Sequence, residues 1–73
     1  MTNNIVFSDK YSVISNMIEY KDIYYVYYYN IITNKYYINE VNNFNNYPLL
    51  NSDNLSIIED EDLFNYLKEV FNV

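Results

Sequence analysis

The stretch that decides the fold is Ile23-Tyr24-Tyr25-Val26-Tyr27-Tyr28-Tyr29-Asn30-Ile31-Ile32, in which almost every residue is β-branched or aromatic. Such residues pack well on a pleated surface and favour a β-strand over a helix. The whole chain has 73 residues, which is enough for one small domain spanning residues 1–73. We therefore expect a central strand over residues 23–32, with the other elements arranged around it.

The segment before this strand, residues 11–20, alternates loosely and is expected to form a neighbouring strand. A tight hairpin turn is expected at Tyr20-Lys21-Asp22, although the chain has no Gly to assist it. The alternation predicts one face that carries Ile14, Ile18 and Tyr20, and an opposite face that carries Tyr11, Val13 and Met17.

The segment after the central strand predicts a second reversal at Thr33-Asn34, where Asn34 can adopt a left-handed backbone. Residues 35–42 then form a third strand, and residues 55–58 are a candidate for a short fourth. Pro48 lies in an Asn-rich stretch between them and is expected to end any strand pairing there. Together these segments predict an antiparallel β-meander.

In the last segment of the chain, the apolar residues recur with a helical period and not with the period of a strand. Apolar residues recur with the spacing of one helix face at Leu63, Phe64, Leu67, Val70 and Phe71, which predicts an amphipathic helix over about 60–72. The predicted fold class is therefore α+β: a three- to four-stranded antiparallel β-meander with one C-terminal amphipathic helix packed on one face.

Tyrosines provide the first candidate site, because one helix covers only one face of a sheet. Of the 11 tyrosines, Tyr24 and Tyr28 of the central strand point one way and Tyr25, Tyr27 and Tyr29 the other. Whichever set faces away from the helix would form an exposed aromatic surface of the kind enriched at binding hot spots. The alternative is that Tyr is simply the strand residue that an AT-rich genome supplies; such a genome is indicated by the many Asn, Tyr and Ile residues, which have A/T-rich codons, and by the absence of Gly and Ala, which have G/C-rich codons. The candidate partner-binding tyrosines are Tyr25, Tyr27, Tyr29 and Tyr36.

An acidic run provides the second candidate site, formed by Glu59, Asp60, Glu61 and Asp62. It would either contact a basic partner or simply begin the helix, whose dipole favours carboxylates in the first turn. A calcium site is a poor match, because the spacing fits no EF-hand loop and the turn Gly is missing.

Charge and composition exclude several function classes. The net charge is −6, and most of it lies in residues 53–73. This field disfavours direct nucleic-acid binding and suits a basic, nucleic-acid-binding protein such as an RNA-guided nuclease complex. Without Cys or His, the usual zinc sites and nucleophile–base pairs cannot form, so we expect a non-enzyme without cofactor or metal.

Membrane association is not expected either. The longest apolar run has seven residues, far fewer than a membrane span needs, and no signal peptide is recognisable. The expected location is cytoplasmic. An exposed strand edge would also allow a homodimer to form by sheet extension.

Several segments resemble the YrzB-like family of small acidic bacterial proteins. They are Ile18-Glu19-Tyr20-Lys21-Asp22, Tyr24-Tyr25-Val26, residues 57–62 and residues 64–71. The resemblance implies a meander followed by a helix with an acidic start. It implies no activity, because that family has no assigned catalytic residues.

Three functions fit these observations. The first is a small phage-type inhibitor of a host defence complex, with the general character of an anti-CRISPR protein, which the AT-rich coding and the acidic charge favour. The second is a housekeeping accessory or regulatory protein of the YrzB-like kind. The third is an antitoxin or immunity protein. For the first, blocking of a protein surface fits better than imitation of nucleic acid, because six net charges represent the dense phosphate charge of a duplex poorly.

Overall fold

The computed structural model describes residues 5–73, and its centre is the predicted strand, β3 (Ile23–Asn30). β3 lies between β2 (Ser12–Tyr20) and β4 (Lys35–Val41), and all three are antiparallel. The short strand β6 (Leu55–Ser56) pairs with the other edge of β4, which completes a four-stranded sheet of order β2-β3-β4-β6. The predicted antiparallel sheet is confirmed.

Both predicted reversals form without any Gly. Lys21 and Asp22, with φ of 53° and 67°, occupy the two-residue turn between the paired residues Tyr20 and Ile23. Two consecutive left-handed residues give a hairpin turn whose twist matches that of the flanking strands. Asn34 is also left-handed, with φ of 63°, as its side chain predicts.

The predicted facing of β2 is wrong, because the strand contains a β-bulge. The pairing with β3 shifts by one residue between Ile14 and Asn16, so the alternation restarts after Ser15. Ile14 and Met17 therefore share one face, whereas Val13 and Ile18 share the other. Loose alternation in the sequence gives no sign of the inserted residue.

A second, smaller sheet forms where the sequence predicts no pairing. β1 (Val6–Phe7) pairs in parallel with β5 (Leu49–Leu50), directly after Pro48. The carbonyl of Pro48 accepts a hydrogen bond from the Val6 N–H at 3.0 Å. Proline lacks only the donor, so it can still take part in a ladder as an acceptor. The Tyr47–Pro48 peptide bond is cis.

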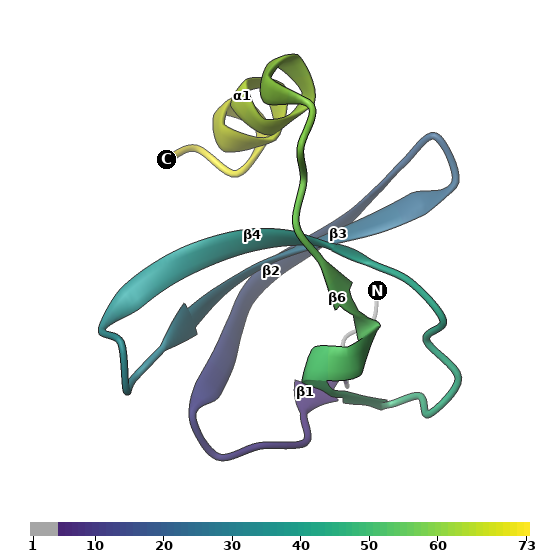
Figure 1. The fold of residues 1–73 in the computed structure, drawn as a ribbon, viewed down its shortest axis with the longest axis vertical. Helices are drawn as coiled ribbons and strands as arrows, with labels where there is room; N and C mark the ends of the chain where they lie inside the picture. The colour runs from purple at the N-terminus through teal and green to yellow at the C-terminus, as the bar shows by residue number, and fades with distance from the viewer. Residues whose placement is uncertain (1–4) are drawn as a thin grey trace.

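The helix α1 (Glu61–Val70) packs against one face of the four-stranded sheet, as predicted. Its N-cap is Asp60, whose side chain accepts from the Leu63 N–H at 3.1 Å. Figure 1 shows α1 on one side of the sheet and β1 on the other. The hydrophobic cluster under α1 has a buried centre of Tyr25, Ile38, Leu67 and Phe71.

The face of the sheet away from α1 is also covered, contrary to expectation. The segment around β1 and β5 packs on it and buries a second cluster, centred on Phe7, Val26, Tyr28, Val41 and Leu50. The segments around β1 and β5 thus form a second layer on this face of the four-stranded sheet. They are too short to show a strand period, so the sequence offered no pattern that would place them there.

Candidate protein-binding surface

The two tyrosine sets of β3 do not divide into a buried and an exposed face. Tyr25, Tyr27 and Tyr29 lie on the helix side, where Tyr25 belongs to the cluster under α1. On the other side Tyr28 is buried, and its hydroxyl donates to Asn39 Oδ1 at 2.7 Å. Neither set forms the continuous exposed band that the sequence suggested.

Tyr25 is removed from the candidate site by this arrangement. Its side chain is only 3% exposed because Leu67 and Phe71 of the helix segment pack over it. Burial raises the pKa of the Tyr25 phenol, and the nearby Glu40 carboxylate and Tyr20 raise it further. Tyr25 therefore stabilises the fold and is not available to a partner.

The other three candidate tyrosines come together where α1 ends. Tyr27 stacks on Tyr36 with ring centroids 5.1 Å apart, and Tyr29 meets Tyr36 at 4.9 Å with tilted rings. We name Tyr27, Tyr29 and Tyr36 the distal patch. Tyr36 is 58% exposed, whereas Tyr27 and Tyr29 are half-buried. These rings form a pre-stacked aromatic surface.

The length of the helix explains why this patch stays open. Ten residues of α1 extend about 15 Å at a rise of about 1.5 Å per residue. Eight residues of β3 extend about 26 Å at about 3.3 Å per residue. The helix segment ends over Tyr27, on which Phe71 stacks with ring centroids 5.4 Å apart. The rest of that sheet face therefore has no helix above it.

Aliphatic side chains extend the distal patch. Val13 of β2 is 57% exposed and pairs in register with Tyr29, which itself pairs with Tyr36. Ile31 and Ile32 in the following turn are also exposed. The Tyr29 hydroxyl donates to Asn34 Oδ1 of the same turn, which fixes the ring at the edge of the patch. The surface is thus apolar with polar tips.

The acidic run lies at the opposite end of α1. Glu59, Asp60, Glu61 and Asp62 are all exposed. Asp60 and Asp62 line a shallow depression with Tyr20, Lys21 and Tyr66, beside the β2–β3 turn. The structure thus separates the two predicted site elements by the length of the helix. Asp60 has a structural role as N-cap, and the helix dipole accounts for its acidic neighbours.

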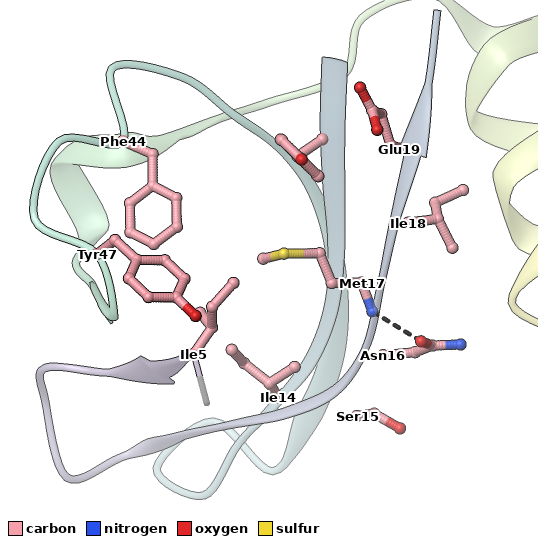
Figure 2. Close-up of a pocket in the computed structure, with 10 residues that line it drawn as sticks. Ile5, Ile14, Ser15, Asn16, Met17, Ile18, Glu19, Phe44 and Tyr47 are labelled. Carbon is pink, nitrogen blue, oxygen red and sulfur yellow. Dashed lines mark hydrogen bonds between the residues drawn. The ribbon is translucent and has the colours of Figure 1, made fainter. Parts of the chain in front are cut away.

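A cleft on the other side of the sheet was not predicted. It has a volume of about 670 Å³ and lies between β2 and the loop that precedes β5. Figure 2 shows its apolar side chains pointing toward one another: Ile5, Ile14, Met17, Phe44 and Tyr47. Glu19 is the only charged residue among those that line it. The sign of this cleft in the sequence is that the Asn-rich loop contains two aromatic residues, Phe44 and Tyr47.

The described part of the chain lacks two structural features: a cluster of potential metal ligands and a helix that could span a membrane. Within residues 5–73 no three His, Cys, Asp or Glu side chains converge on a common point. Over the same residues, no helix is long and apolar enough to cross a membrane.

Comparison of the chain with protein-family models, curated proteins and solved structures finds no match.

Proposed function

We propose that this chain is a small phage-type inhibitor without catalytic activity, which binds a host nucleic-acid-processing defence complex in the host cytoplasm. It would act like an anti-CRISPR protein that covers a protein surface of an RNA-guided nuclease complex. The observation that carries the proposal is the distal patch, where Tyr36 and Tyr29 present aromatic area and hydroxyl groups beyond the end of α1. Tyrosines of this kind supply much of the binding energy at protein interfaces.

The charge distribution supports surface blocking over nucleic-acid mimicry. The acidic run is confined to the start of one helix, and a duplex carries about one charge per 1.7 Å along its axis. A short cluster at one end of the molecule favours approach to a basic partner without tracing a phosphate backbone. We therefore assign contact to the distal patch and steering to residues 59–62.

The first test is a pull-down of the tagged chain from bacterial lysate that expresses candidate defence complexes, followed by mass spectrometry. Recovery of an RNA-guided nuclease or one of its subunits supports the proposal. Recovery of a ribosomal or metabolic protein would favour a housekeeping accessory role. Recovery of a small basic toxin would favour an antitoxin or immunity protein.

The second test separates the distal patch from the acidic run. Combining Tyr29→Ala with Tyr36→Ala should weaken binding of the recovered partner at least about tenfold, which corresponds to about 1.4 kcal/mol. Tyr24→Ala is the matched control, because Tyr24 is an exposed tyrosine on the opposite face of β3. Replacing the four acids of residues 59–62 by Gln or Asn should mainly slow association and reduce its salt dependence. Loss of binding only in the charge variant would favour mimicry.

A further inference from the structure

β2 forms one edge of the four-stranded sheet. It pairs with β3 on one side, and within residues 5–73 no strand pairs with its other side. On the opposite edge, β6 pairs only with Glu40 and Val41 of β4, so the stretch of β4 that has no second partner within the described chain, residues 35–39, is shorter than β2. β2 has nine residues, so it is a long unpaired edge of the type that natural proteins usually block or use for assembly.

The register shows which peptide groups of β2 point outward. In an antiparallel ladder, hydrogen-bonded and non-hydrogen-bonded pairs alternate, and the pair that flanks a two-residue turn is hydrogen-bonded. Tyr20 flanks the turn, so Met17 and Glu19 occupy non-hydrogen-bonded positions and direct their N–H and C=O groups away from β3. The Met17 N–H accordingly donates to Asn16 Oδ1 at 2.8 Å, as the dashed line in Figure 2 shows.

The same reasoning applies before the bulge. The Ile31 N–H donates to the Tyr11 carbonyl at 2.8 Å, so Ser12 and Ile14 are the residues with outward peptide groups there. The Ser12 N–H donates to Asp9 Oδ1 at 2.8 Å instead of to β3. Both side-chain bonds lie at the exposed edge and can be exchanged for bonds to another strand. The outward set of β2 is therefore Ser12, Ile14, Met17 and Glu19.

This set is symmetric about the bulge. A two-fold axis between Ser15 and Asn16 aligns Ile14 of one copy with Met17 of a second copy, and Ser12 with Glu19. All four outward positions then meet outward positions, because both strands carry the same inserted residue. The edge is thus complementary in its backbone to an antiparallel copy of itself.

The side chains of β2 follow the same symmetry. Residues 11–20 have the sequence Tyr-Ser-Val-Ile-Ser-Asn-Met-Ile-Glu-Tyr, in which aromatic, polar and aliphatic residues occur in the same order from either end. In the register described, Val13 faces Ile18 on the helix side of the sheet. Ile14 faces Met17 on the side of the cleft, and both are half-buried with their outer surface open. Cross-strand aliphatic pairs of this kind stabilise sheets.

The charges also permit two copies to meet here, although each has a net charge of −6. Glu19 is the only charged residue of β2, and antiparallel pairing places the two copies of Glu19 at opposite ends of the strand pair. Lys10 lies two positions before Ser12, the residue that faces Glu19. The acidic starts of α1 lie near Tyr20 and are separated by about 30 Å, the length of the strand pair, which exceeds the Debye length of about 8 Å at physiological salt.

We propose that two copies of this chain form a homodimer by antiparallel pairing of β2 with β2, which creates a continuous eight-stranded sheet. The two-fold axis passes between Ser15 and Asn16, and Ile14 and Met17 of each copy extend the floor of the other's cleft. β2 and the cleft supply fewer than the about 20 residues per side of a standard interface, so the dimer dissociates in the micromolar range.

Sedimentation velocity between about 1 and 500 µM tests this dimer, because the range spans micromolar dissociation constants. Ser15→Lys places two like charges beside the two-fold axis, at an exposed position that contributes nothing to either hydrophobic cluster. It should raise the dissociation constant at least about tenfold at low salt. Ser15→Glu should do the same, and a mixture of the two variants should restore a heterodimer. Ser52→Lys, at another exposed serine, is the matched control and should leave the dimer unchanged.

Cross-linking provides a second readout in the otherwise native chain, which has no Cys. Ser15→Cys should form a disulfide-linked dimer on mild oxidation, because residues beside the axis fall within the Cα separation of about 4.4–6.8 Å that a disulfide needs. Ser52→Cys should not. The proposal is overturned by a chain that stays monomeric throughout, or by a dimer that responds equally to changes at Ser15 and Ser52. Tyr29 and Tyr36 take no part in this pairing, so the dimer and the proposed inhibitor function can fail separately.

Discussion

Phe71, the C-cap residue of α1, stacks on Tyr27 of β3 with an interplanar angle of 26°. This contact divides the tyrosines on that face of the sheet. Tyr25, before the contact, is buried under the helix, whereas Tyr29 and Tyr36, beyond it, contribute to an open surface. The same face of β3 thus carries the core residue Tyr25 and the candidate binding residue Tyr29, and the position where the helix ends decides which of them is buried.

The two hydrophobic clusters should contribute comparably to stability. Leu67 belongs to the cluster under α1 and Leu50 to the cluster on the other face, and both have 0% exposure. Leu67→Ala and Leu50→Ala should each lower the free energy of unfolding by about 2–5 kcal/mol. Urea denaturation followed by circular dichroism measures this. Leu49→Ala is the control, because Leu49 is exposed beside Leu50; a small effect of Leu50→Ala would show that the second layer is dispensable.

The β2–β3 turn should accept the Gly that the sequence lacks. Asp22 has φ of 67°, a conformation that costs a residue with a Cβ about 1 kcal/mol. Asp22→Gly relieves this cost and should raise the free energy of unfolding by about 0.5 kcal/mol after the entropy of Gly in the unfolded chain is subtracted. Thermal unfolding measures the shift. Asp53→Gly should be destabilising, because Asp53 lies in a 3₁₀ turn and does not have positive φ.

Asn54 should be required for the loop that carries β5. Its side-chain amide is buried and donates to the carbonyls of Asn42 and Asn43, at 3.2 and 2.8 Å. Its Oδ1 accepts from the Asn51 N–H at 3.1 Å. Asn54→Ala leaves these backbone groups without their partner and should cost about 2 kcal/mol or more. Amide hydrogen exchange should show faster exchange at Asn51; an unchanged rate there would contradict this role.

Of the four residues in the acidic run, Asp60 should be the one that stabilises the fold. Asp60→Ala removes the N-cap bond to Leu63 and should lower the free energy of unfolding by about 1 kcal/mol. Asp60→Asn keeps a good capping residue and should cost much less, although it removes the same charge. Glu59→Ala should be nearly neutral, because Glu59 is exposed and precedes the cap. Equal losses for Asn and Ala at position 60 would indicate that charge, and not capping, matters there.

Alkaline pH should unfold the protein through its buried phenols. Burial raises the pKa of Tyr25 and of Tyr28, and neighbouring groups raise both further, among them Glu40 for Tyr25 and Tyr37 for Tyr28. A pKa that is higher in the folded state means that the protein keeps this stability below the ordinary phenol pKa of about 10 and loses it as the pH rises above that value. Absorbance at alkaline pH, followed together with circular dichroism, should show ionisation coupled to unfolding.

A single substitution tests this coupling. Tyr25→Phe removes one of the two ionisable groups and should shift the midpoint of alkaline unfolding to higher pH. Tyr66→Phe is the control, because Tyr66 is an exposed tyrosine of α1. An equal shift for both variants would show that the burial of Tyr25 is not the cause.

Local chemistry determined most of the elements. β-branched and aromatic residues over residues 23–30 can form little besides a strand, and the spacing of Leu63, Leu67 and Phe71 specifies one helix face. Asn34 takes the left-handed conformation that its side chain tolerates. These features depend on neighbours within a few positions, so the sequence alone predicts them.

Only the tertiary structure decided which surfaces stay open. The bulge at Ser15 reverses the facing of half of β2 and brings Ile14 and Met17 onto one face of the sheet. The second layer from β1 and β5 buries Val26 and Tyr28, which local pattern could not assign to either face. Burial is a property of contacts between distant segments. For that reason Tyr25, a tyrosine in one predicted strand, becomes a core residue, whereas Tyr36, a tyrosine in the next predicted strand, becomes a surface residue.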